Sequence, residues 1–173
     1  MKKQSAGLLV YRQSNGRLEV LIAHMGGPFH AKKDYGHWSI PKGEYDEGED
    51  PKQVARREFG EELGKAVPDG DWLELGSIEY KNKKRVLIWA IEGNLDATHT
   101  TSNTFKMEWP PGSGKTQEFP EIDRAGWYGI DEAAKKLVPA QAEFLERLAE
   151  KLGKKFDRAS GESGAEPKQN TLF

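Results

Sequence analysis

The chain has 173 residues, no cysteine, and 26 lysine and arginine side chains against 28 aspartate and glutamate side chains, a formal net charge of -2. This length suits one domain with a substantial core, the charge balance argues against DNA as a partner, and the lack of cysteine excludes disulfides and cysteine-ligated zinc. No stretch approaches the roughly 18 apolar residues of a membrane span and no secretion signal is recognisable, so the sequence predicts a soluble, cytoplasmic protein without membrane contact. The oligomeric state stays open.

Most of the predicted elements are strands. Runs rich in apolar and β-branched side chains predict strands at residues 5–12, 17–24, 37–40, 72–80, 85–91, 104–109 and 126–130. Asn15 and Gly16 suit the positive φ angles of a tight hairpin turn between the first two, and Pro41 ends the third. The polar, glycine-containing loop at residues 25–36 is long enough to be functional.

One helix in the middle of the chain has clear start and stop signals. Asp50 suits the N-cap, Pro51 suits the first helical position where its missing N–H does no harm, and Gly64 suits a left-handed C-cap. These signals predict a helix that begins near Pro51 and ends before Gly64.

Two further helices are predicted near the end of the chain. Asp131 is expected to cap a helix that reaches residue 137, and Pro139 opens another that ends at Gly153. Residues 157–173 show no apolar periodicity before Leu172 and Phe173 and predict a flexible tail. The expected organisation is therefore one α/β domain with a mixed sheet over residues 1–156, followed by this tail.

The central helix gathers acidic residues. Glu58, Glu61 and Glu62 share one face, because residues three and four apart on a helix lie about 5–6 Å from each other. Folding does not require like charges to be grouped in this way, and a divalent cation would turn their repulsion into attraction. Carboxylate oxygens suit Mg²⁺ or Mn²⁺, which proteins often hold together with water and substrate phosphates. The pattern therefore predicts metal-assisted phosphate hydrolysis.

The same residues form a longer motif that resembles the Nudix box, GX5EX7REUXEEXGU with U a bulky apolar residue. The matching positions are Gly43, Glu49, Arg57, Glu58, Phe59, Glu61, Glu62 and Gly64. Lys65 departs from the pattern, since the last position is normally apolar. The resemblance implies an α/β/α sandwich and a hydrolase that cleaves a pyrophosphate linkage in a small nucleotide substrate with Mg²⁺, or with Mn²⁺ in its place.

The resemblance also implies roles for individual residues. It makes Glu58 and Glu62 the main metal ligands, Glu61 a further ligand, and the backbone carbonyl of Lys42 part of the metal shell. Arg57 and Glu49 become supporting residues.

Such enzymes often take another ligand or general base from a glutamate before the last strand. Glu121 is the better match, because it lies six residues before Trp127, and Glu118 competes with it.

The substrate is indicated less sharply. Residues 38–43, with the sequence WSIPKG, are similar to the W-x-x-P-K-G entrance of diadenosine polyphosphate hydrolases and related nucleoside polyphosphate enzymes. Lys42 is expected to bind a substrate phosphate, and Tyr80 lies close to the position of a substrate-binding tyrosine in that group. The alternative is a Nudix-fold module that binds a nucleotide without turnover, although a complete carboxylate set argues against it.

Other residues allow weaker interpretations. A basic rim and base-stacking aromatic residues are possible at Lys32, Lys33, Arg85, Phe29 and Tyr35. Residues 112–116 imitate the end of a phosphate-binding P-loop but lack its first glycine, so they are interpreted as a hairpin tip. The spacing of His24, His30 and His37 fits no zinc motif.

Overall fold

The computed structural model describes residues 3–156 of the protein. The predicted tail at residues 157–173 lies outside the described residues. Within them, no helix is long and apolar enough to cross a membrane.

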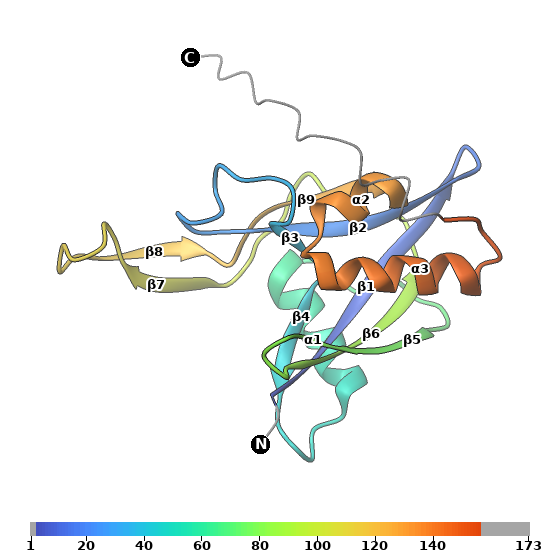
Figure 1. The fold of residues 1–173 in the computed structure, drawn as a ribbon, viewed down its shortest axis with the longest axis horizontal. Helices are drawn as coiled ribbons and strands as arrows, with labels where there is room; N and C mark the ends of the chain where they lie inside the picture. Colours follow the sequence, from blue (N-terminus) through green and yellow to red (C-terminus); the bar gives the residue numbers. More distant parts are fainter. Residues whose placement is uncertain (1–2, 157–173) are drawn as a thin grey trace.

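A seven-stranded mixed sheet forms the centre of the protein (Figure 1). Its strands are β1 (Gln4–Ser14), β2 (Arg17–Met25), β3 (Trp38–Ser39), β4 (Lys42–Tyr45), β5 (Leu73–Glu79), β6 (Arg85–Glu92) and β9 (Ile122–Gly129). The order is β3-β2-β1-β6-β5, with β4 also pairing with β1 and β9 also pairing with β2. Only the β1–β6 pair is parallel among these strand pairs of the described chain.

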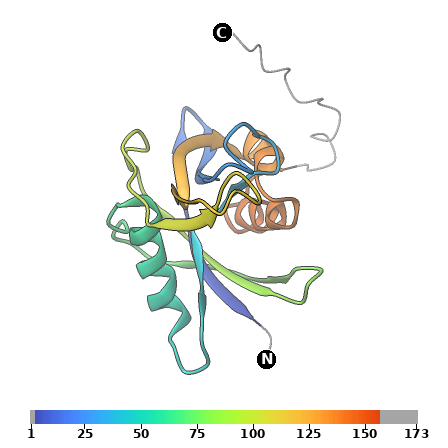
Figure 2. The same cartoon turned by 90° about the vertical axis from the view of Figure 1, so that its left-hand side faces the viewer.

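Helices cover both faces of this sheet, and Figure 2 shows the three layers from the side. The helix α1 (Pro51–Leu63) lies on one face, and α2 (Ile130–Lys136), a 3-10 turn (Pro139–Gln141) and α3 (Ala142–Lys151) lie on the other. Strand β1 serves both cores because its side chains alternate. Leu8 packs toward α1 and Leu9 packs toward α3. The predicted α/β/α sandwich with a mixed sheet is confirmed.

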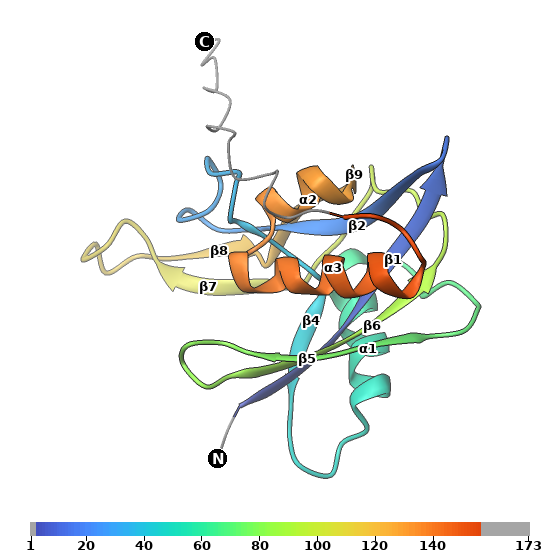
Figure 3. The same ribbon diagram turned by 45° about the vertical axis from the view of Figure 1, so that its right-hand side comes forward.

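A separate two-stranded hairpin extends from the body of the protein, as Figure 3 shows. It consists of β7 (Thr104–Glu108) and β8 (Thr116–Pro120), joined by the segment that imitates a P-loop. The hairpin tip was predicted, whereas β8 was not, because its residues are nearly all exposed and carry no apolar alternation.

Backbone geometry confirms the predicted hairpin turn and corrects the predicted start of α2. Asn15 and Gly16 have φ angles of 52° and 74°, which confirms the predicted hairpin turn. The cap at Asp131 was wrong, since α2 starts at Ile130 and its N-cap is Gly129 without a side-chain hydrogen bond. Asp131 instead lies in the first turn, where its charge still interacts favourably with the helix dipole.

Candidate active site

Helix α1 presents the predicted acidic face. The Asp50 side chain accepts a hydrogen bond from the Lys52 N–H at 3.1 Å, and Gly64 ends the helix with φ 64°. The side of α1 that faces the sheet is buried through Val54, Ala55, Phe59 and Leu63. This packing fixes the rotation of the helix, so Glu58, Glu61 and Glu62 point away from the apolar core that they flank.

Arg57 connects three of the acidic residues. Its guanidinium nitrogens lie 3.5 Å from Glu49 Oε2, 3.7 Å from Glu58 Oε1 and 4.0 Å from Glu61 Oε1. Glu49 is itself held by the Asp46 N–H, which donates to Glu49 Oε1 at 3.0 Å. The structure therefore brings together the box residues Glu49, Arg57, Glu58 and Glu61, and Arg57 can limit how far the carboxylates separate.

Gly43 explains why the motif begins with a glycine. A Cβ atom at residue 43 would overlap the carboxyl group of Glu58, so Glu58 can lie against strand β4 in this position only because residue 43 has no side chain. Burial raises the pKa of Glu58, and the Glu61 carboxylate raises it further, while Arg57 acts in the opposite direction. Glu58 is thus a crowded, partly desolvated acid.

Glu62 is the most perturbed acid of the group. Burial raises the pKa of Glu62 to about 8, although the Lys42 ammonium and a backbone hydrogen bond of Lys42 favour the ionised form. The charges of Glu58 and Glu121 raise this pKa further. A carboxylate that is both buried and surrounded by like charges is characteristic of a functional site.

Lys42 is a half-buried residue of β4 beside these carboxylates. Burial lowers the pKa of Lys42, and the Glu62 carboxylate acts against that shift. In the described part of the chain, its ammonium forms no ion pair within 4.0 Å. The positive charge therefore balances Glu62 only at longer range and keeps its hydrogen-bonding capacity, which suits an incoming phosphate.

The donor set fits a hard divalent cation. Its side-chain members are all carboxylates, burial and, to a smaller extent, neighbouring carboxylates raise the pKa values of Glu58 and Glu62, and a cation would relieve the repulsion. Among residues 3–156, no three acidic or histidine side chains already converge on one point at ligand spacing. The arrangement therefore suits Mg²⁺, which commonly takes one or two carboxylates and completes its shell with water and phosphate oxygens.

The structure distinguishes the two candidate loop glutamates. Glu121 is exposed between β8 and β9, and its charge raises the pKa values of Glu58 and Glu62. Glu118 instead accepts a hydrogen bond from the Thr104 hydroxyl on the hairpin. Glu121 is thus the one that lies near the acidic residues of α1.

Tyr80 and the predicted rim residues lie in different surroundings. The Tyr80 hydroxyl accepts a hydrogen bond from Gln141 at 2.9 Å, and Gln141 also accepts one from the Ile40 N–H just before Pro41. Arg85 donates to Ser77 at 3.0 Å, whereas Lys32 and Lys33 are exposed.

Among residues 3–156, Phe29 is the large hydrophobic side chain that is exposed. It has 56% of its surface exposed and contacts the edge of Trp109 on the hairpin, with the ring centroids 5.5 Å apart.

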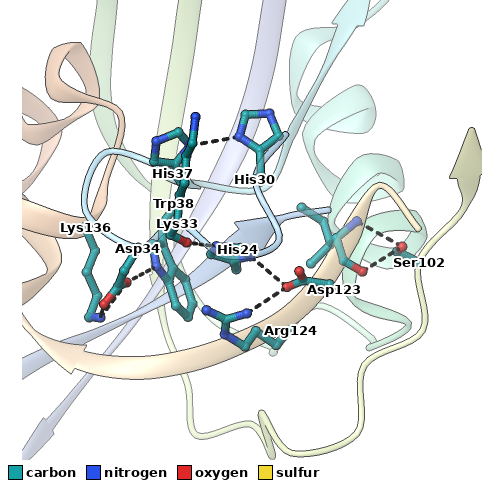
Figure 4. A network of polar contacts seen from close by, with 11 residues as sticks. His24, His30, Lys33, Asp34, His37, Trp38, Ser102, Asp123, Arg124 and Lys136 are labelled. Carbon is teal, nitrogen blue, oxygen red and sulfur yellow. Dashed lines mark hydrogen bonds and ion pairs between the residues drawn. The ribbon is translucent and has the colours of Figure 1, made fainter. Parts of the chain in front are cut away.

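A polar network around His24 was not predicted (Figure 4). His24 Nδ1 lies 2.8 Å from Asp123, which is 99 residues away in the sequence, and this separation leaves no local sequence signal. His30 and His37 face each other through their Nδ1 atoms at 2.9 Å. His24 thus contacts Asp123 and the Lys33 carbonyl, whereas His30 and His37 contact each other.

Known proteins share this sequence pattern and fold. The sequence model of the NUDIX domain family matches residues 1–148. A bis(5'-nucleosyl)-tetraphosphatase (asymmetrical) of Caenorhabditis elegans is 42% identical over 62 residues, which are 36% of this chain and only 41% of that protein. An RNA pyrophosphohydrolase of Aeromonas hydrophila subsp. hydrophila is 25% identical over 138 residues, 75% of this chain and 78% of that protein. A crystal structure of a C. elegans Ap4A hydrolase binary complex is similar with a TM-score of 0.61 and 25% identity, over 86% of this chain and 98% of that chain.

Proposed function

Because this chain belongs to the NUDIX domain family, we propose that it hydrolyses a pyrophosphate linkage in a nucleoside polyphosphate with the help of Mg²⁺. Dinucleoside polyphosphates are the first candidate substrates, and nucleoside triphosphates are the second. The proposal rests above all on one observation, that Arg57 holds Glu49, Glu58 and Glu61 together next to the buried Glu62.

The proposed chemistry assigns a task to each group. Mg²⁺, when bound, neutralises phosphate oxygens and lowers the pKa of a coordinated water. Glu58, Glu61 and Glu62 hold the cation on α1, and the backbone carbonyl of Lys42 completes their set. Glu121, whose charge acts on Glu58 and Glu62, is the candidate that accepts the proton of the attacking water.

Binding of the substrate is assigned to residues at the rim. Lys42 has an ammonium without a close ion-pair partner among the described residues, and we assign it to a substrate phosphate. Phe29 is the exposed aromatic side chain that is best placed for stacking on a base. Tyr80 stays a candidate whose ring, rather than its Gln141-bonded hydroxyl, would contact the substrate.

The preference for dinucleoside polyphosphates has two supports. Residues 38–43 have the W-x-x-P-K-G form, and two of the similar proteins are described as enzymes that act on such compounds. The similarity to an RNA pyrophosphohydrolase makes the 5' end of RNA a further compound to test.

A substrate panel tests this proposal. The purified chain is incubated with Mg²⁺ and with diadenosine polyphosphates, nucleoside triphosphates, sugar nucleotides, diphosphoinositol polyphosphates or 5'-triphosphorylated RNA, and the products are identified. We expect the highest kcat/KM for a dinucleoside polyphosphate and a turnover at least about 10²-fold lower for Glu62→Gln. Saturable binding of a nucleotide without any Mg²⁺-dependent cleavage would instead identify a non-catalytic nucleotide-binding module.

A further inference from the structure

Strand β9 contains an irregularity directly after Glu121. From Glu19↔Gly129 to His24↔Arg124, strands β2 and β9 keep one register, but Met25 then pairs with Ile122. Asp123 is therefore an extra residue, a β-bulge. Because side chains alternate along a strand, one extra residue reverses the faces of all residues before it. The bulge thus decides where Ile122 and Glu121 point.

The reversal has a visible result at Ile122, directly before the bulge. Ile122 is buried in the core beneath α1, together with Phe59. Glu121, its neighbour, is exposed and close enough to Glu58 and Glu62 to raise their pKa values. Because of the extra residue, Ile122 lies on the same face of β9 as Ala125 and Trp127, and Glu121 precedes it in the adjoining loop.

Two side chains hold the bulge in place, as Figure 4 shows. The buried His24 contacts Asp123 Oδ1 through Nδ1 at 2.8 Å and the Lys33 carbonyl through Nε2 at 2.6 Å. The Ser102 hydroxyl bonds both main-chain groups of Ile122, donating to the carbonyl at 3.0 Å and accepting from the N–H at 3.1 Å. These bonds replace ladder hydrogen bonds that a bulge disrupts.

The backbone of Glu121 is fixed as well. Its N–H donates to the Asn103 carbonyl at 2.8 Å, and its carbonyl accepts from the Gly26 N–H at 2.8 Å. Asn103 in turn donates from its N–H to the Glu61 carbonyl of α1 at 3.3 Å. A short chain of main-chain hydrogen bonds therefore connects α1 to Glu121.

We propose that the His24–Asp123 pair is a positioning device that fixes the bulge in β9 and thereby aims Glu121 at the acidic face of α1. His24 and Asp123 act through Glu121 and do not touch the substrate. The inference rests on the proposed function, because it takes Glu121 as the group that works beside Glu58 and Glu62. The proposed chemistry does not use the ring of the buried His24, and this inference assigns that ring the task of holding the bulge.

The test compares two substitutions of the same residue. Asp123→Asn keeps an oxygen that can accept from His24 Nδ1, whereas Asp123→Ala removes it. We expect Asp123→Ala to lower kcat about ten- to a hundredfold, since small displacements of a reacting group have effects of this size, with KM changed less than threefold or so. Asp123→Asn should restore most of the lost kcat.

A double-mutant cycle separates positioning from general structural damage. If Asp123 acts through Glu121, then Asp123→Ala combined with Glu121→Gln is no slower than Glu121→Gln alone. If the two effects multiply, the proposal is wrong even though Glu121 matters. If Glu121→Gln alone has the kcat of the parent, the assumed role of Glu121 is wrong, and with it this inference.

One further measurement does not depend on turnover. In the metal-free protein, hydrogen–deuterium exchange of the peptide around residues 119–125 should be faster in Asp123→Ala than in Asp123→Asn. Equal exchange in both variants would contradict the bulge-holding role.

Asp34→Asn is the matched control, because Asp34 belongs to the same network but bonds Trp38 and Lys136, away from the bulge. It should lower the melting temperature and leave kcat and the exchange of this peptide unchanged. If Asp34→Asn lost a comparable part of kcat, the loss of kcat in Asp123→Ala would result from loosening of the whole loop and not from loss of the bulge.

Discussion

Replacing Gly43 with alanine tests whether the approach of β4 to α1 sets the position of Glu58. The methyl group would overlap the Glu58 carboxyl group, whereas carbon atoms in contact normally stay about 3.5–4.0 Å apart. Glu58 must therefore move by an ångström or more, on the order of the displacement that lowers turnover about a hundredfold. We expect Gly43→Ala to lower kcat by about that factor.

The same substitution should hardly change stability. Gly43 is not among the glycines with positive φ, so alanine fits its backbone, and the group that must move is the end of a flexible side chain. We therefore expect a melting temperature close to that of the parent. The assay pairs thermal melting with Mg²⁺-dependent hydrolysis of the best substrate.

Gly60 on the same helix offers a matched control. The nearest atom to a Cβ there is the Lys65 carbonyl oxygen at 3.8 Å, an ordinary contact. Gly60→Ala should leave kcat unchanged and stabilise the protein by about 0.5–1 kcal/mol, the usual gain for alanine over glycine inside a helix. If Gly43→Ala retained kcat within about threefold, the steric reasoning about Glu58 would be refuted.

Four more outcomes are expected. Glu62→Gln should lower turnover at least about 10²-fold while the circular dichroism spectrum and melting curve stay native, because it removes a metal ligand but no packing; near-normal turnover at saturating Mg²⁺ would exclude the assignment. Lys42→Ala should lower kcat/KM about ten- to hundredfold, the value of a charge-assisted hydrogen bond, without weakening Mg²⁺ activation; unchanged kcat/KM would leave Lys42 as a strand residue without a role in binding. Phe29→Ala should raise KM about tenfold with little change in kcat if a base stacks there, and an unchanged KM would remove Phe29 from the binding site. Asp34→Asn should reduce the unfolding free energy at pH 7 by about 1.5–3 kcal/mol. Burial raises the pKa of Asp34, but hydrogen bonds from Lys136 and Trp38 outweigh it, so the net pKa is lowered. The carboxylate therefore stabilises the fold above its unfolded pKa of about 3.9 and loses this effect as the pH falls through the lower folded value. Melting curves from pH 7 to pH 3 should show parent and variant converging, and a constant difference would contradict this linkage.

The sequence by itself determined the helix and its acidic face. Asp50, Pro51 and Gly64 are local signals for where a helix starts and stops, and the spacing of Glu58, Glu61 and Glu62 fixes their shared face through helix geometry alone. Arg57 reaches Glu58 and Glu61 for the same reason, since they are one and four residues away. Such features depend on near neighbours in the chain, so no tertiary structure is needed to predict them.

Only the tertiary structure decided what comes to the acidic face from elsewhere. The extra residue in β9 before Arg124 and the contact between His24 and Asp123, which are 99 residues apart, have no local signal in the sequence. The close approach of Gly43 to Glu58 and the partial burial of Lys42 beside Glu62 depend on how β4 pairs with β1. Register and burial arise from packing between distant segments, and the alternation of a strand cannot reveal a bulge until its partner strand is known.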